Sequence, residues 1–177
     1  MITGTNGTGK TTLAKELIKR FGGIKATLAD RTVCNDERFV FLGRYADDIK
    51  HGGCDGLNET KHLATIAADA FSKGAQVVFG EGSYLNTFGI NLSNFLFAGD
   101  KQLVVFLAAP FDEINKRLEI RSGTDIKDTV AKKQLMGRNA AKKWHEIGVP
   151  TKGFDTSQNT TAEIADFIIS RLWCGDK

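Results

Sequence analysis

The sequence predicts a three-layer α/β domain in which a mainly parallel, five-stranded sheet carries helices on both faces. Two observations lead to this class. Short apolar runs alternate with segments of helical periodicity along the 177 residues, a pattern that is typical of strand–helix–strand units. A glycine-rich segment, Gly4–Thr11, also stands between a short apolar run and an amphipathic pattern. Because this length suffices for one sizeable core, we expect a single domain over residues 1–177.

The glycine-rich segment reads GTNGTGKT and matches the phosphate-loop pattern G-x-x-x-x-G-K-[ST]. Its glycines permit backbone turns that direct successive N–H groups toward phosphate oxygens. Lys10 is expected to reach the outer phosphates of ATP, and the Thr11 hydroxyl is expected to ligate Mg²⁺. The predicted nucleotide-binding residues of this segment are Gly4, Thr5, Asn6, Gly7, Thr8, Gly9, Lys10, Thr11 and Thr12.

A strand should precede this loop and a helix should follow it. Apolar residues from Leu13 to Phe21 recur at helical spacing with charged residues on the other face, so we expect a helix over Lys10–Phe21. The strand before the loop is expected to be short, because Met1–Thr3 are the residues that lead into Gly4.

The remaining elements alternate along the chain. Uninterrupted apolar runs predict strands that are buried on both faces, and apolar residues three and four positions apart predict helices. Thr160 and Glu163 form a capping box, which predicts the start of the last helix. Strands are expected at 24–28, 38–42, 75–79, 102–108 and 148–154, and helices from a cap near Asn58 through 71, at 91–97, at 111–121, at 125–145 with a break near Gly137, and after 160.

Composition is that of an ordinary globular protein, with 41% hydrophobic and 25% charged residues. No apolar run approaches membrane length and no leader peptide is visible, so we expect a cytoplasmic protein without a membrane partner. Cys34, Cys54 and Cys174 contain no C-x-x-C pair, which indicates free thiols in a reducing compartment. Two of them lie near His51 and His62, but the spacing matches no common zinc module.

Positive charge is concentrated between Lys116 and Lys152. This segment holds ten Lys or Arg and four acidic residues, which gives it a charge of +6 within a chain of net charge +3. Such clustering indicates contact with the phosphates of a nucleotide or of nucleic acid. The alternative is a solvated helix face, which explains some of these charges.

Glu81 follows the apolar run Val77–Phe79. In a parallel sheet, functional groups gather at the carboxyl ends of the strands, beside the phosphate loop. The Glu81 carboxylate can there hold the Mg²⁺ shell or accept a proton from an attacking hydroxyl. The alternative is an exposed turn residue between two glycines.

Three arginines are candidates for stabilising a transferring phosphoryl group. Arg117 and Arg121 are four residues apart and therefore share one helix face, and Arg138 lies in the charged segment that follows. Guanidinium groups stabilise the spread negative charge without changing protonation. This arrangement favours a mobile basic lid over about 121–147. A plain surface position is the alternative, above all for Arg117.

The acceptor substrate is expected along Arg38–Asp55. Arg44 can pair with a phosphate, Tyr45 can stack on a base, and Asp55 can bind a sugar or a hydroxyl. Asp30 is a further candidate base. A flexible surface loop is the alternative for this segment.

Four pieces of the chain resemble phosphate-loop kinases of the nucleoside and nucleotide monophosphate kinase group: GTNGTGKTT, VVFGEG, LAAPFDEINKRLEIRSG and GFDTSQNT. The resemblance implies a P-loop NTPase fold, ATP and Mg²⁺ as cofactors, a lid after Arg121 and an adenine-bordering turn at Asp155–Asn159. Glu81 stands where many relatives carry an Asp-Arg pair. The pieces FLGRY and GGCDG also resemble small kinases of tailed bacteriophages that phosphorylate 5-hydroxymethyluracil in DNA, which implies a DNA acceptor.

The leading hypothesis is therefore an ATP-dependent kinase. Its expected acceptor is the hydroxymethyl group of 5-hydroxymethyluracil in phage DNA, and free deoxynucleotides or nucleosides are the alternative. A P-loop ATPase or a nucleotide-binding module is the competing class. The oligomeric state stays open. The hypothesis assigns catalysis to Lys10, Glu81, Arg121 and Arg138, the metal to Thr11 and Glu81, and nucleotide binding to the loop and Arg117.

Overall fold

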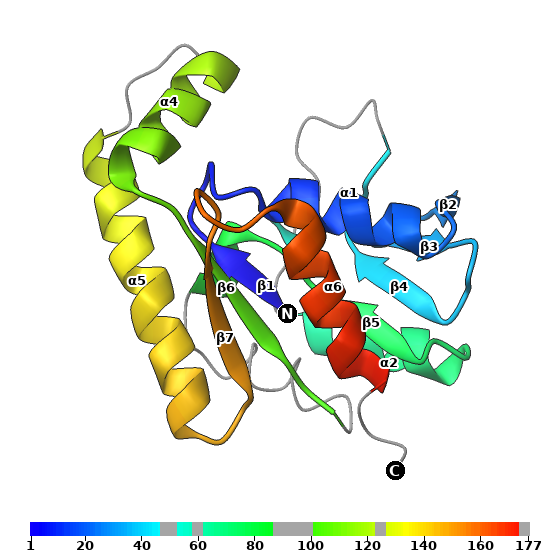
Figure 1. The fold of residues 1–177 in the computed structure, drawn as a ribbon. Coiled ribbons are helices and arrows are strands. Elements are labelled where there is room, and N and C mark those ends of the chain that lie inside the picture. Colours follow the sequence, from blue (N-terminus) through cyan, green and yellow to red (C-terminus); the bar gives the residue numbers. More distant parts are fainter. Residues whose placement is uncertain (47–52, 58–61, 87–100, 123–126, 174–177) are drawn as a thin grey trace.

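The computed structural model describes residues 1–46, 53–57, 62–86, 101–122 and 127–173 (Figure 1). Strands and helices alternate over much of the chain, as the sequence pattern predicts, although three strands follow α1 in succession and two helices follow β6. Their bounds are β1 (Ile2–Gly4), α1 (Lys10–Arg20), β2 (Ile24–Thr27), β3 (Arg31–Cys34), β4 (Phe39–Leu42), η1 (Cys54–Gly56), α2 (Leu63–Ser72), β5 (Val77–Phe79), η3 (Ser83–Asn86), β6 (Val104–Ala108), α4 (Phe111–Ser122), α5 (Lys127–Glu146), β7 (Thr151–Asp155) and α6 (Thr161–Trp173).

The strands form two sheets that meet at β1. One is parallel, with the order β1-β6-β7, and the other has the order β2-β3-β4-β5. In the second sheet β4 and β5 are parallel, and the other two pairs are antiparallel. A parallel bridge joins Ile2 to Glu81, and the Ile2 N–H donates to the Gly80 carbonyl at 2.8 Å. This bridge brings the carboxyl ends of β1 and β5 together.

The division into two sheets differs from the single five-stranded sheet that was expected. β1 is three residues long, and beside Met1 the space between β5 and β6 is a cavity of about 970 Å³. Its lining includes Val78, Leu103 and Phe167. Because β1 is so short, the described strands β5 and β6 diverge around this cavity, and the link between the sheets is the bridge at Ile2.

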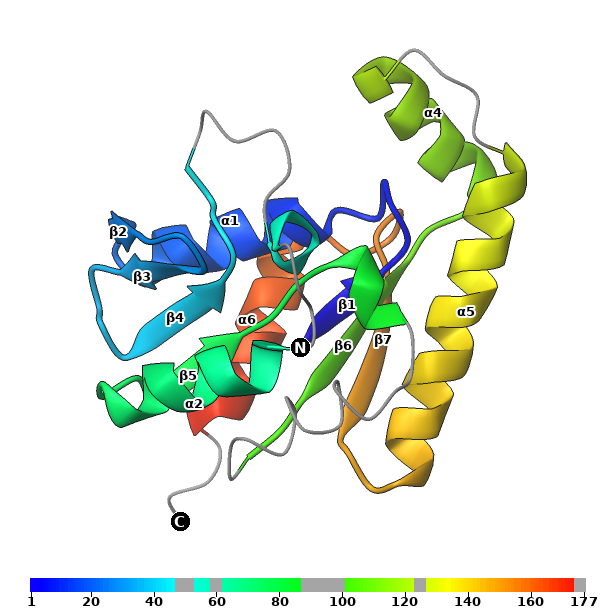
Figure 2. The same ribbon diagram turned by 180° about the vertical axis from the view of Figure 1, so that it is seen from behind.

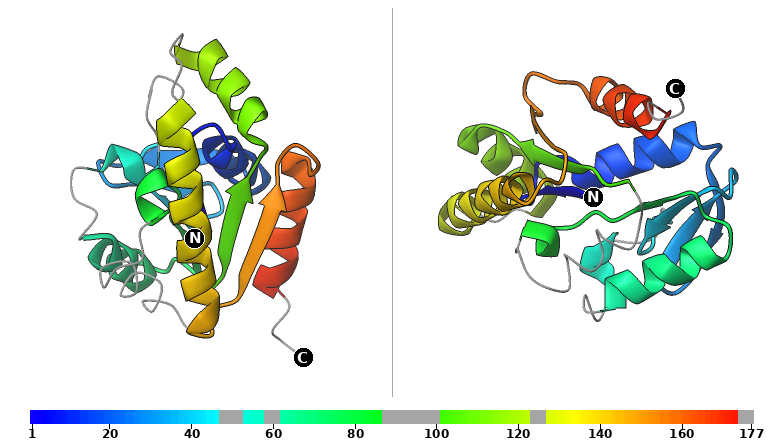
Figure 3. Two further views of the ribbon diagram at one scale, coloured as in Figure 1. Left: turned by 90° about the vertical axis from the view of Figure 1, so that its left-hand side faces the viewer. Right: turned by 90° about the horizontal axis from the view of Figure 1, so that it is seen from below.

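Helices cover both faces of the sheets, as expected. Figure 3 shows α1 and α6 together on one side, and Figure 2 shows α2 and α5 on the other. The core on the first side includes Leu17 and Ile168, and the core on the second includes Leu63 and Trp144. Neighbouring residues of β6 belong to opposite cores, with Val105 in the first and Val104 in the second. The strand is therefore buried on both faces, as its apolar run predicts.

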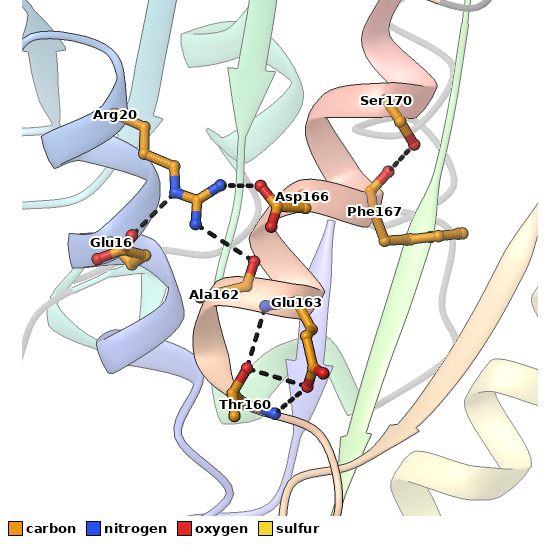
Figure 4. A network of polar contacts seen from close by, with 8 residues as sticks. All are labelled: Glu16, Arg20, Thr160, Ala162, Glu163, Asp166, Phe167 and Ser170. Carbon is orange, nitrogen blue, oxygen red and sulfur yellow. Dashed lines mark hydrogen bonds and ion pairs between the residues drawn. The ribbon is translucent and has the colours of Figure 1, made fainter.

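Polar contacts attach α6 to α1 at its exposed edge (Figure 4). Arg20 on α1 pairs with Glu16 on its own helix and with Asp166 on α6. The capping box at the start of α6 is confirmed: the Thr160 N–H donates to Glu163 at 2.7 Å, and the Glu163 N–H donates to the Thr160 hydroxyl at 3.2 Å. Both backbone donors are satisfied by side chains, which fixes where α6 begins.

Two elements differ from the expectation in instructive ways. β3 was not expected, because its sequence RTVC carries a charged residue; Arg31 is nevertheless buried, since it pairs with Asp30 and Asp69 at 2.9 and 2.7 Å. The expected break near Gly137 is wrong, because α5 is continuous from Lys127 to Glu146. Packing of this helix on the sheet outweighs the cost of about 1 kcal/mol for an internal glycine. The expected cap at Asn58 and the expected helix at 91–97 lie outside the described residues.

Candidate active site

The phosphate loop runs from the end of β1 to the start of α1. Its three glycines all have positive φ, with values of 143°, 80° and 85° at Gly4, Gly7 and Gly9. A Cβ on Gly4 would lie 2.4 Å from the Leu107 carbonyl oxygen of β6. Glycine is therefore required at position 4 by both conformation and space, as the motif predicts.

The loop also packs against α4. A Cβ on Gly7 would lie 3.2 Å from side-chain carbons of both Ile114 and Leu118. These two residues form a small core with Val130 at the start of α5. The helices that follow β6 thus support the outer side of the phosphate loop.

Lys10, the first residue of α1, is almost completely buried, with 6% of its surface exposed. Its ammonium group donates to the Thr5 carbonyl at 2.9 Å and therefore points back over the loop. The Thr5 hydroxyl is buried and has no hydrogen-bond partner among the described residues. A cation and an unsatisfied hydroxyl inside a ring of backbone N–H groups match the needs of a phosphate oxygen.

Thr11 and Glu81 meet although they lie 70 positions apart. The Thr11 hydroxyl donates to the Glu81 carboxylate Oε1 at 3.1 Å. Glu81 is 1% exposed, so it is not the exposed turn residue of the alternative interpretation. Thr12, by contrast, is exposed on α1. The structure therefore brings Lys10, Thr11 and Glu81 together at the carboxyl ends of β1 and β5, where the sequence predicts the chemistry.

Burial raises the pKa of Glu81 to about 7. The positive charge of Lys10 and the hydrogen bond from Thr11 act in the opposite direction, and the negative charge of Asp55 adds to the rise. Loss of hydration is the largest of these effects. A carboxyl group with a pKa near neutrality is suited to proton transfer, and it is equally suited to ionising when a cation arrives.

A wall of backbone covers Glu81 on the side away from α1. Gly53 pairs with Arg44 in an antiparallel bridge, and a Cβ on Gly53 would lie 2.4 Å from Glu81 Oε1. The Cys54 N–H donates to the Glu81 carbonyl at 2.7 Å. A Cβ on Gly43 would lie 2.1 Å from the Gly53 carbonyl oxygen. Gly43 and Gly53 therefore allow their two segments to approach the segment that contains Glu81. The unusual glycine content of this part of the sequence is the local sign of that close approach.

The predicted acceptor residues occupy different positions in this wall. Arg44 is exposed at its edge. Asp55 accepts from the Ser83 N–H at 2.9 Å and from the Ser83 hydroxyl at 3.1 Å, so it ties the wall to the chain after β5. Asp30 is bound by two hydrogen bonds from Arg31, at 3.0 and 2.9 Å. Both carboxylates thus have structural partners.

Tyr45 lies in the core rather than on a surface that could stack on a base. It is 2% exposed, and its ring meets that of Phe41 edge-on, with 5.7 Å between centroids. The Tyr45 hydroxyl is buried beside Glu81 and interacts with it as a hydrogen-bond donor, in a geometry short of a well-formed bond. Burial raises the pKa of this hydroxyl well above its ordinary value. The structure therefore does not support the expected stacking contact.

Arg117 connects the phosphate loop to the turn between β7 and α6. Its guanidinium donates to the Gly7 carbonyl at 3.3 Å, to the Thr156 hydroxyl at 3.0 Å and to the Thr156 carbonyl at 3.2 Å. Glu113 holds the same side chain at 2.9 Å from one turn earlier. Thr156 was not singled out from the sequence, although it lies in the turn expected to border adenine.

The other two arginines belong to the helices that follow β6. Arg121 belongs to α4, one turn after Arg117. Arg138 is exposed in the second half of α5, which runs from Val130 beside α4 to Trp144 in the core beside Met1. The described structure does not bring Arg138 together with Lys10, and most of the expected lid is a helix packed on the sheet.

The donor set fits a nucleotide triphosphate with Mg²⁺. The loop offers backbone N–H groups, a buried ammonium and a buried hydroxyl for phosphate oxygens, and Thr11 with Glu81 offers oxygen ligands. Mg²⁺ is commonly held by one or two protein oxygens together with substrate phosphates and water. Among the described residues, no group of three or more His, Cys, Asp or Glu side chains is arranged to hold a metal ion.

The remaining candidates are incidental to this site. Cys34 and Cys54 are buried and form no disulfide, and His62 is exposed. His51 and Cys174 lie outside the described residues. Within the described ranges, every helix is too short or too polar to cross a membrane.

Fold and site together define a mixed α/β protein whose glycine-rich loop, with the pattern G-x-x-x-x-G-K-[ST], lies at the junction of its sheets. No protein-family model matches the chain, and no curated protein matches it. Among solved structures, the chain is similar to the crystal structure of the YorR protein from Bacillus subtilis in complex with phosphorylated GDP. The TM-score is 0.58 at 20% identity, and the match covers 97% of this chain and 94% of YorR. The likeness shows a shared fold over nearly the whole length.

Proposed function

We propose that this protein is an ATP- and Mg²⁺-dependent phosphotransferase that moves the terminal phosphoryl group of ATP to a hydroxyl. The observation that carries the proposal is the junction of Lys10, Thr11 and Glu81. A loop cation, a loop hydroxyl and a buried carboxylate meet at the carboxyl ends of two neighbouring strands, with 3.1 Å between the Thr11 and Glu81 oxygens. Phosphoryl transfer is catalysed mainly by positioning and by charge stabilisation, and these groups supply both.

Each residue then has a defined task. Lys10 exchanges the Thr5 carbonyl for a phosphate oxygen, and the loop N–H groups surround the phosphates. Thr11 and Glu81 would hold Mg²⁺, which when bound neutralises charge on the phosphates. In the alternative role, Glu81 would accept the proton of the acceptor hydroxyl instead of holding the metal. Arg121 is the candidate for charge stabilisation from α4.

The proposal includes a single functional sheet of the P-loop NTPase type. The bridge at Ile2 aligns β5 beside β1, so the parallel strands β4, β5, β1, β6 and β7 follow one another in space. The phosphate loop then leaves the central strand of the five. In open α/β sheets, ligands bind at the carboxyl ends of the strands where the order reverses, which is where this loop lies.

Two acceptor classes are each favoured by one observation. The basic segment 116–152 favours a polymer, and we propose the hydroxymethyl group of 5-hydroxymethyluracil in DNA as that acceptor. Lys132, Arg138, Lys142 and Lys143 are exposed along α5, where they can meet a phosphate backbone. A free nucleotide is the second candidate, because the YorR structure with the same fold contains phosphorylated GDP.

A transfer assay with labelled ATP tests the function and separates the acceptors. The protein is incubated with Mg²⁺ and, in turn, deoxynucleotides, unmodified DNA and DNA that contains 5-hydroxymethyluracil. Label in the modified DNA supports the polymer acceptor, and its incorporation should fall steeply as salt rises. Label in a mononucleotide supports the second candidate. Transfer to water alone would indicate an ATPase, and transfer that persists in Lys10→Ala would overturn the proposal.

A further inference from the structure

The Tyr45 ring is held in place by contacts that leave it no freedom to turn outward. Its backbone N–H donates to the Thr32 hydroxyl at 3.2 Å, and that hydroxyl donates to the Gly43 carbonyl at 3.0 Å. The segment after β4 is thereby fastened to β3. On the other side the ring packs edge-on against Phe41, at an interplanar angle of 74°. The position of the phenol oxygen is therefore fixed by the core.

This fixed hydroxyl is buried and lies beside the Glu81 carboxylate, with which it interacts as a hydrogen-bond donor. The geometry of this contact falls short of a well-formed hydrogen bond. A phenol O–H next to a carboxylate forms a strong hydrogen bond once distance and angle are right.

Glu81 has limited room in which to reorient. Its Oε1 accepts from Thr11 at 3.1 Å and also occupies the space that a Cβ on Gly53 would need. A carboxylate has about four lone-pair sites, so the Thr11 hydroxyl leaves acceptor capacity for a second donor. Gly53 brings backbone close to the same oxygen, which restricts how the carboxylate can turn.

We propose that Tyr45 is a positioning residue, whose hydroxyl donates to Glu81 and holds the carboxylate in the orientation that binds Mg²⁺ beside Thr11. The inference rests on the proposed function, because it assigns a partner to the proposed metal ligand. Hydrogen bonds to ligating carboxylates orient them, and their loss typically weakens metal binding 10- to 100-fold. The contact between the buried phenol and Glu81 becomes a well-formed hydrogen bond when the site is loaded.

The test measures Mg²⁺ dependence separately from nucleotide binding. A fluorescent ATP analogue is titrated into wild type and Tyr45→Phe, first with a chelator and then over a range of Mg²⁺ concentrations. We expect equal affinity with the chelator, and a Mg²⁺ midpoint raised about tenfold in Tyr45→Phe. Thermal unfolding should change little, because the variant keeps the buried ring and removes a hydroxyl whose contact with Glu81 is not well formed in the ligand-free protein.

Two further variants complete the design. Gly53→Ala introduces a methyl group 2.4 Å from Glu81 Oε1, so it should raise the Mg²⁺ midpoint by displacing the carboxylate rather than by removing the phenol. Phe167→Leu changes a half-buried aromatic side chain on α6, and it is the matched control for loss of core packing. It should leave the Mg²⁺ midpoint within twofold of wild type.

The outcomes separate this inference from the proposed function. A Mg²⁺ midpoint within twofold of wild type in Tyr45→Phe overturns the inference, as does an equal loss of affinity with the chelator. If the wild type binds the nucleotide in a Mg²⁺-dependent way but transfers no phosphoryl group, the proposed phosphotransferase function is wrong. The binding data then still decide the role of Tyr45. If the wild type binds no nucleotide at all, both proposals are wrong.

Discussion

Replacement of Glu81 by glutamine should make the protein more stable at alkaline pH than the wild type. The folded-state pKa of Glu81 is about 7, against an ordinary value of 4.5, because the carboxyl group is buried. The folded protein therefore prefers the protonated form. Stability from this group is fully present below pH 4.5 and is lost as pH rises through 7. Glutamine has the shape of the protonated side chain, accepts from Thr11 through its amide oxygen, and does not ionise.

The size of the effect follows from the shift. A change in pKa from 4.5 to about 7 corresponds to about 3 kcal/mol. The free energies of unfolding of wild type and Glu81→Gln should therefore be similar at pH 4.5. At pH 8 the variant should be the more stable protein by about 3 kcal/mol. The difference should grow by about 1.4 kcal/mol for each pH unit between pH 4.5 and about 7, and it should level off above that.

Urea denaturation at pH 4.5, 6, 7 and 8, followed by tryptophan fluorescence, measures this difference in ligand-free protein. Glu119→Gln on the exposed face of α4 is the control for the loss of a carboxylate as such. Its stability relative to wild type should change little between the four conditions. A difference between wild type and Glu81→Gln that stays within about 0.5 kcal/mol at every pH, roughly the error of additive comparisons, would refute the reasoning. Glu81 would then be ionised at no cost.

Three further changes test other parts of the structure. Gly4→Ala places a Cβ 2.4 Å from the Leu107 carbonyl oxygen at a φ of +143°. It should destabilise the fold by about 3 kcal/mol or more, as measured by thermal unfolding, and abolish ATP-analogue binding, as measured by titration. Arg117→Ala removes the link between Gly7 and the β7–α6 turn, and it should weaken ATP-analogue binding about tenfold or more in the same titration while the fold persists. Trp144→Ala empties a fully buried site between α5 and the sheet, which should lower the free energy of unfolding by about 3–5 kcal/mol in urea denaturation.

Features that depend on nearby residues could be predicted from the sequence. The phosphate loop, α1 and the capping box of α6 each follow from spacings of a few residues, and all are present in the structure. Packing overrode local preference in α5, where an internal glycine did not break the helix. β3 escaped prediction because the partners that neutralise Arg31 include Asp69, which lies on a distant helix.

The candidate site shows the same dependence on distance along the chain. The sequence placed Glu81 after a buried strand, but its burial comes from Gly53 and Cys54, which lie on a different segment and whose approach no local pattern reveals. Tyr45 was expected to face a substrate, because its ring could stack on a base. The hydrogen bond to Thr32 turns it inward instead. The same inward turn that removes its ring from the surface puts its hydroxyl beside the carboxylate. The segment predicted to select the acceptor therefore also builds the wall of the phosphoryl-transfer site, so changes in that segment should alter metal binding as well as acceptor choice.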